Sequence, residues 1–238
     1  MNPGELQLPK DLPDPSPGTW KQSAQGLALS VPLDDGSEHL LRVDFLTGAM
    51  GYRLKHGGGR GQAVARAMGM KKGRTPPTVV DATAGLGRDS FLLAWLGCKV
   101  VALERDARIF ALLQDGLRRA LLDPECHEGL GDQLTFIHAD AISWLRHADA
   151  FLPDVVYLDP MHPERRKSAQ VRKEMRMFRA LVGSDTDSKE LLQEALRIAQ
   201  DRVVVKRPRI GEELLAKPSH VQQGKSTRFD IYLQTIKD

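Results

Sequence analysis

Residues 78–104 read TVVDATAGLGRDSFLLAWLGCKVVALE. Within this stretch, the apolar runs Thr78–Asp81 and Lys99–Glu104 are rich in β-branched residues and predict two buried strands. Residues 88–96 lie between the runs and predict a helix. A strand, a helix and a second strand in this order are typical of a parallel sheet with helices on both faces.

The same alternation continues to the end of the chain. We expect further strands at 134–139, 154–159 and 202–206, helices at 107–121, 141–147, 168–182 and 188–200, and a closing strand pair at 220–223 and 227–234. The pattern predicts an α/β fold with a mostly parallel sheet and an antiparallel hairpin at its C-terminal end.

The first 77 residues follow a different pattern. Residues 1–18 contain five prolines and few apolar residues, which predicts an irregular arm. Apolar residues alternate at 26–31 and at 39–45, and Asp34-Asp35-Gly36 between them predicts a turn. A linker at 71–77 sets the main boundary. The expected units are an arm at 1–18, a small β/α unit at 19–77 and a main domain at 78–238.

The composition narrows the class of protein. Of 238 residues, 41% are hydrophobic and 27% are charged, as in ordinary globular chains, and the formal net charge is +3. The sequence has no run of 18 apolar residues and no signal pattern at its start, so we expect a cytoplasmic protein without a membrane span. Cys98 and Cys126 lack metal-ligand spacing, so we expect free thiols and no bound metal.

The turn after the strand at Thr78–Asp81 is the first candidate binding site. Gly85 and Gly87 have no Cβ, so the backbone there can approach a ligand closely. Ligands of open parallel sheets bind at the carboxyl ends of the strands. Asp81 and Asp89 can bind the ammonium group of a ligand, and Arg88 can bind its carboxylate. The alternative is a tight turn that binds nothing.

Acidic residues at the ends of the next two strands suggest a nucleoside ligand. Glu104 can accept hydrogen bonds from both ribose hydroxyls of NAD or S-adenosylmethionine, or it can simply neighbour the helix cap Asp106. Ser90 occupies the third small position of a dinucleotide turn, but the Asp89 carboxylate before it would repel a pyrophosphate, which favours S-adenosylmethionine. Asp140 can accept a hydrogen bond from the adenine amine, cap the following helix, or do both.

The sequence VVYLDPMHP at 155–163 carries the sharpest chemical signal. It resembles the Asn/Asp-Pro-Pro-aromatic motif of methyltransferases that act on exocyclic amines, with Met161 and His162 at the last two positions. Asp159 and the backbone around Pro160 can accept both N–H groups of an amine and aim its lone pair at a methyl group, and such positioning supplies up to about 7–11 kcal/mol. His162 can stack on the base. The alternative is a strand-ending turn.

Basic residues follow the fourth and fifth strands of the main domain. They would lie near the carboxyl edge of the sheet beside the candidate site, which favours contacts with RNA phosphates over a merely solvated face. The candidates are Arg165, Arg166, Lys167, Arg172, Lys173, Lys206 and Arg207.

Several long motifs occur together and in order: DATAGLGRDSFLLAWLGCKVVALER, VVYLDPM, KSAQVRKEMRMFRALVG, RVVVKRP and RFDIY. Over about residues 50–235 the chain resembles the bacterial 16S ribosomal RNA guanine-N2 methyltransferases. The resemblance implies a Rossmann-like class I methyltransferase sheet, S-adenosylmethionine as methyl donor and a guanosine of small-subunit rRNA as target. It also implies ligand contacts at Arg88-Asp89, Glu104-Arg105, Asp140-Ala141 and Asp159.

Two other functions stay open on the residues alone. An NAD(P)-dependent oxidoreductase would place Arg105 against a 2′-phosphate. A non-catalytic RNA-binding protein would explain the departures at Met161 and His162. A DNA amine methyltransferase shares the chemistry, but the first 77 residues are small and polar for a domain that reads duplex DNA.

Overall fold

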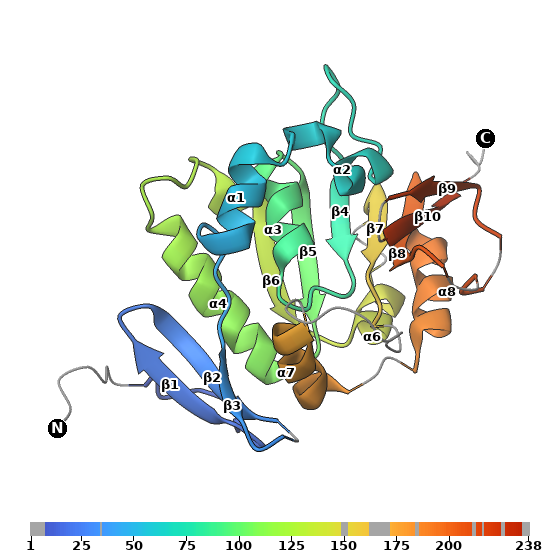
Figure 1. Cartoon of the computed structure of the whole chain (residues 1–238). Helices are drawn as coiled ribbons and strands as arrows, with labels where there is room; N and C mark the ends of the chain where they lie inside the picture. The colour runs from blue at the N-terminus through green and yellow to red at the C-terminus, as the bar shows by residue number, and fades with distance from the viewer. Residues whose placement is uncertain are drawn as a thin grey trace, which may run out of the picture.

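The computed structural model describes residues 8–33, 35–148, 152–161, 172–183, 186–210, 213–215, 217–224 and 227–234, with the backbone alone at 172–174. A seven-stranded sheet with the order β6-β5-β4-β7-β8-β10-β9 forms its centre (Figure 1). The strands are β4 (Thr78–Asp81), β5 (Lys99–Glu104), β6 (Leu134–His138), β7 (Val155–Leu158), β8 (Arg202–Pro208), β9 (His220–Gln223) and β10 (Thr227–Leu233).

Five of these strands are parallel, and the last two form a hairpin. Each neighbouring pair from β6 to β8 is parallel, whereas β10 is antiparallel to both β8 and β9. The chain crosses from β6 back to β7 beside β4, so the strand order reverses there and leaves a crevice at the carboxyl ends. The predicted sheet, including its closing hairpin, is confirmed.

Helices cover both faces of the sheet because successive side chains of a strand point to opposite sides. Val79 packs in one hydrophobic cluster with Phe91 and Leu112, whereas Val80 packs in a second cluster with Leu145 and Leu192. The first face carries α3 and α4, and the second carries α6 and α8 (Figure 1). The helices are α3 (Arg88–Trp95), α4 (Ala107–Leu121), α5 (Leu130–Gln133), α6 (Ala141–Arg146), α7 (Arg172–Val182) and α8 (Ser188–Ile198).

A separate antiparallel sheet, β1 (Thr19–Ser23), β2 (Gly26–Pro32) and β3 (Glu38–Leu41), packs against α4. The contact is close: a Cβ on Gly116 of α4 would lie 2.7 Å from a methyl carbon of Val43. The Asp115 carboxylate accepts hydrogen bonds from the backbone N–H of Leu27 at 3.0 Å and from Arg119 at 2.7 Å. The small sheet is therefore joined to the main domain by both apolar and polar contacts.

Three short elements connect the two sheets: α1 (Gly48–His56), the 3-10 turn η1 (Gly59–Gly61) and α2 (Ala63–Ala67). The strand β1 and the helix α1 were not predicted from the sequence. Buried residues of β2, α2 and β4 belong to one hydrophobic cluster, so the core is continuous across the linker at 71–77. The domain boundary after residue 77 therefore stays a prediction.

Within the part of the chain that the structure describes, no helix combines the length and apolarity that crossing a bilayer requires.

We expect Asp115→Ala to lower the free energy of unfolding by about 1–3 kcal/mol, because it leaves the N–H of the buried residue Leu27 without its acceptor and removes the ion pair with Arg119. Asp132→Ala is the control, since Asp132 is an exposed acid on the neighbouring α5. Denaturant unfolding of both variants measures the difference. Equal stability of the two variants would show that Asp115 does not anchor the small sheet.

Candidate active site

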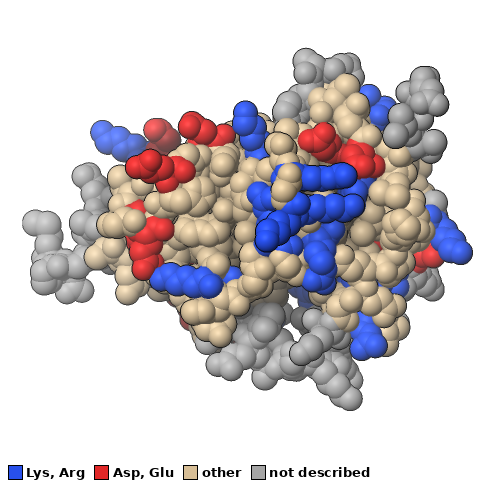
Figure 2. All heavy atoms as spheres, turned by 90° about the horizontal axis from the view of Figure 1, so that it is seen from above, with Lys and Arg blue, Asp and Glu red and all other residues tan. Residues whose placement is uncertain are grey.

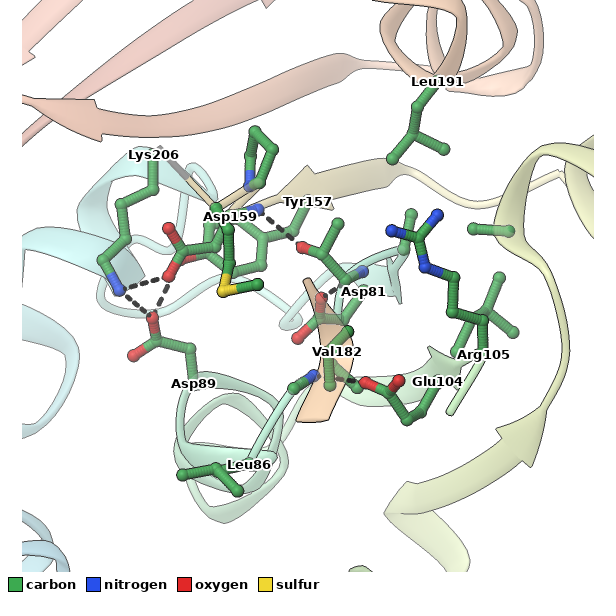
Figure 3. A pocket seen from close by; sticks show the side chains of 18 of the residues that line it. Asp81, Leu86, Asp89, Glu104, Arg105, Tyr157, Asp159, Val182, Leu191 and Lys206 are labelled. Carbon is green, nitrogen blue, oxygen red and sulfur yellow. Dashed lines mark hydrogen bonds and ion pairs between the residues drawn. The ribbon is translucent and has the colours of Figure 1, made fainter. Parts of the chain in front are cut away.

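A cavity of about 350 Å³ opens at the carboxyl ends of β4, β5, β6 and β7. Met175 and Phe178 of α7 and Leu191 of α8 line it from outside the sheet. Figure 3 shows Asp89, Asp159 and Lys206 on one side of this pocket and Glu104 and Arg105 on the other. The predicted site residues in its lining are Asp81, Gly85, Arg88, Asp89, Glu104, Arg105, Asp140, Ala141, Asp159 and Pro160.

Glu104 is a buried carboxylate held by backbone donors. One of its oxygens accepts the N–H of Gly85 at 2.9 Å, and the other accepts the N–H of Asp106 at 2.8 Å. Burial raises the pKa of Glu104 to about 7, although these two hydrogen bonds favour the charged form. Gly85 has a φ of +53°, so the backbone turns toward Glu104 in a conformation that favours glycine.

Asp81, at the end of β4, is fully enclosed. It accepts a hydrogen bond from the Ser90 hydroxyl at 2.5 Å and another from the Thr83 N–H at 3.0 Å. Burial raises the pKa of Asp81 to about 7. The Ser90 bond connects the end of β4 to α3 and the Thr83 bond lies within the turn, so Asp81 stabilises the shape of the turn as well as lining the cavity.

The other side of the cavity contains a cluster of charges. The Lys206 ammonium lies 2.9 Å from Asp89 Oδ2 and 2.7 Å from Asp159 Oδ2. Arg53 pairs with the second oxygen of Asp89 at 2.8 Å, and the Tyr157 hydroxyl donates to Asp89 at 2.8 Å. Burial opposes the charge of Asp89, but Lys206 and Arg53 outweigh it and hold the pKa of Asp89 well below its usual range.

Asp159 stands at the exit of β7, next to Pro160. Its backbone N–H donates to the Thr83 hydroxyl at 2.6 Å, which joins the turn after β7 to the turn after β4. The carboxylate is 38% exposed and remains accessible from the cavity while it pairs with Lys206. The site thus presents an ionised, firmly held carboxylate at its open side.

Several predicted residues have a structural role. Gly87 begins α3 with a φ of +70°, and a Cβ there would lie 2.6 Å from Leu113; it is absent from the described lining of the cavity. Asp140 caps α6 by accepting the Ser143 N–H at 2.8 Å and also lines the cavity. Arg105 forms an ion pair with Asp187 at 2.7 Å.

Of the predicted RNA-binding residues, some lie outside the described part of the chain and two lie elsewhere than expected. His162, Arg165, Arg166 and Lys167 lie outside the described residues, as do the side chains of Arg172 and Lys173 in α7. Lys206 was expected at the rim, but it forms the ion pairs inside the site. Arg207 was also expected at the rim, but its side chain points to the opposite side of β8 and is 8% exposed, near Asp230.

Arg53, Thr83 and Tyr157 also take part in the site and were not predicted from the sequence. Arg53 is on α1 and reaches Asp89 from 36 positions away, and no local pattern marks it. Tyr157 had a detectable signal, because it stands two residues before Asp159 in a strand and therefore on the same face.

Residues 12–234 match a family described as putative SAM-dependent methyltransferases. The chain belongs to this family. It is 53% identical over 195 residues to a protein named ribosomal RNA small subunit methyltransferase J from Shewanella amazonensis, covering 82% of this chain and 78% of the relative. It is 48% identical over 239 residues to the protein of that name from Laribacter hongkongensis, covering 92% and 84%.

A solved structure supports the same assignment. The SAM-dependent methyltransferase from Neisseria gonorrhoeae superposes with a TM-score of 0.72 at 37% identity, covering 98% of this chain and 88% of that one. The chain is therefore an S-adenosylmethionine-dependent methyltransferase with a class I sheet, and S-adenosylmethionine is its methyl donor.

We expect Lys206→Met to lower the free energy of unfolding by roughly 3 kcal/mol, because it leaves Asp89 and Asp159 facing each other without their shared cation. Adding Asp89→Asn removes one of the two charges and should recover part of this loss. Denaturant unfolding of the single and double variants gives the coupling free energy. Strictly additive effects would mean that the three charges do not act as a unit.

Proposed function

We propose that this methyltransferase transfers a methyl group from S-adenosylmethionine to the exocyclic N2 amine of a guanosine in 16S rRNA of the small ribosomal subunit. The observation that carries the proposal is the position of Asp159-Pro160 at the open side of the cavity. The relatives named small-subunit rRNA methyltransferases and the motif resemblance support the RNA substrate. The choice of guanine N2 rests on the resemblance alone.

The residues around the cavity fit the donor. Glu104 can accept hydrogen bonds from ribose hydroxyls, and Asp140 with Ala141 is placed to meet the adenine. On the other side of the cavity, Asp81 and Asp89 provide negative charge for the ammonium and sulfonium groups. Arg88 is exposed at the rim, where it can meet the donor's carboxylate, and Arg105 is at the ribose side. When bound, the donor supplies an electrophilic methyl group.

Asp159 positions the acceptor amine in this mechanism. The Asp159 carboxylate forms an ion pair with the Lys206 ammonium at 2.7 Å, and a charged carboxylate is a strong hydrogen-bond acceptor for the amine. Accepting an N–H from the amine, together with the backbone at Pro160, localises the nitrogen lone pair. The N–C bond then forms as the C–S bond breaks, and the nitrogen afterwards loses a proton to solvent. His162 keeps its predicted role as a stacking partner for the base.

The site argues against the oxidoreductase alternative. Arg105, which would meet a 2′-phosphate, is already paired with Asp187 at 2.7 Å. The acidic turn at Asp81 and Asp89 is unfavourable for a pyrophosphate. The charge cluster at Asp159 favours an enzyme over a merely RNA-binding protein, because clustered charged groups in a cleft are typical of catalytic sites.

The proposed function implies an RNA-binding surface, a partner and a cellular compartment. The candidates for phosphate contacts are Arg165, Arg166, Lys167, Arg172 and Lys173, which follow Asp159-Pro160 in the chain. Small ribosomal subunits, or their 16S rRNA, are then the partner, and the reaction takes place in the cytoplasm.

Asp159→Ala should reduce kcat for methyl transfer by about 10²–10³-fold, because the amine loses its charged acceptor. S-adenosylmethionine should still bind. The assay follows label from radiolabelled donor into small subunits or 16S rRNA from cells that lack the gene, with Asp201→Ala, an exposed acid away from the cavity, as control. Full activity of Asp159→Ala, or no labelling of 16S rRNA by the unaltered enzyme, would refute the proposed function.

Glu104→Gln should weaken S-adenosylmethionine binding roughly tenfold at pH 8, because a neutral amide accepts hydrogen bonds from ribose less strongly. In the unaltered enzyme, affinity should fall as the pH drops through about 7, where Glu104 becomes protonated. The variant should have a shallower profile, with Asp81 contributing what remains. Calorimetric titration between pH 6 and 8.5 measures both, and identical profiles would exclude Glu104 from donor binding.

A further inference from the structure

One segment of the chain is basic throughout. Residues 45–80 contain seven Lys or Arg and no Asp or Glu, although the whole chain has 31 acidic residues. Two of the seven have carboxylate partners: Arg53 pairs with Asp89, and Lys55 pairs with Glu125. The other five are Arg60, Arg66, Lys71, Lys72 and Arg74, which we call the basic face.

The basic face lies at the opposite end of the molecule from the cavity. It is formed by η1, α2 and the linker before β4, and therefore lies at the amino end of that strand, whereas the cavity lies at the carboxyl ends (Figure 1). Figure 2 views this end and shows Lys and Arg side chains gathered in a cluster near its middle, with Asp and Glu along one edge of the cluster.

The backbone of the basic face is held in place by its own arginines. Arg60 donates to the carbonyl oxygens of Lys71 at 3.3 Å and Arg74 at 3.2 Å, and so holds the linker against η1. Arg66 donates to the carbonyl of Gly61. Lys71, Lys72 and Arg74 are exposed, and within the described residues none of the five pairs with a carboxylate. Among the residues that the structure describes, these cations therefore have no carboxylate partner.

We propose that the basic face binds the phosphate backbone of a second rRNA segment, distinct from the one that carries the target base. This inference rests on the proposed function. Exposed lysine and arginine side chains suit phosphate, which carries charge but no sequence information. The face therefore adds affinity and orientation, and base selection stays at the cavity.

The distance between the two ends favours a folded RNA. The strands between them have four to seven residues and span about 13–23 Å at roughly 3.3 Å per residue. A base in the cavity and a phosphate on the basic face are then separated by about the length of these strands. Only RNA that passes around the protein, as the folded rRNA of a small subunit can, reaches both.

The test compares two pairs of lysines with the same chemical change. Lys71→Gln/Lys72→Gln removes two charges from the basic face, and Lys10→Gln/Lys21→Gln removes two exposed charges from the arm and β1. Binding of 16S rRNA is measured by filter retention over a range of salt concentrations. The first variant should lose about 1.4–1.8 from the slope of log K against log salt, since each phosphate contact contributes about 0.7–0.9.

Kinetics on small subunits give a second readout. Lys71→Gln/Lys72→Gln should raise KM for the subunit roughly tenfold while kcat and donor affinity stay unchanged, because the pocket is untouched. An unchanged slope and KM, or equal losses in both double variants, would overturn the inference. Failure of the proposed function gives a different result: the unaltered enzyme then labels no 16S rRNA, while the binding slopes still decide the role of the basic face.

Discussion

The ammonium of Lys206 lies between the carboxylates of Asp89 and Asp159, and this contact joins three separate parts of the fold. Asp89 is on α3, Asp159 follows β7, and Lys206 is on β8, so the ion cluster sets how the β4 turn and the β7 exit face each other. Without the cation, two carboxylates would repel each other across a partly buried space. Arg53 extends the cluster to α1 and thereby links the N-terminal region to the site.

The sequence predicted those elements whose local pattern agrees with their packing. β4, β5 and β8 are short β-branched runs bounded by turns, and their burial on both faces is what such runs predict. β1 was missed because TWKQS is mostly polar and exposed. The helix α1 contains two glycines and has weak helix propensity; it forms because Met50 and Gly51 pack closely, with no room for a Cβ on Gly51 against the Leu46 carbonyl.

In the candidate site too, residues marked by a local pattern were predictable and residues that depend on tertiary packing were not. Asp81, Glu104 and Asp159 were predictable because each ends a parallel strand, and the carboxyl ends of parallel strands meet at one edge. The basic side chains that pair with the carboxylates at this edge were not predictable in the same way. Lys206 was recognised as basic and near the site, but its position between two carboxylates depends on the register of β8 against β7. Arg207, one residue later, points the other way for the same reason.

Net charge conceals how the molecule separates its charges. The formal charge of +3 is the balance of 34 Lys and Arg against 31 Asp and Glu. Asp81, Asp89, Glu104, Asp140 and Asp159 line the cavity together with the cations Arg53, Arg88, Arg105 and Lys206, whereas the basic face lies at the opposite end of the sheet. The carboxylates of the pocket suit a cationic donor. Three of the cations in the lining are already paired with carboxylates: Arg53 with Asp89, Arg105 with Asp187, and Lys206 with Asp89 and Asp159. Attraction for a polyanion therefore comes mainly from charges outside the pocket, and a basic face at the far end of the same strands lets one small domain hold a sulfonium ligand and a polyanion at separate sites.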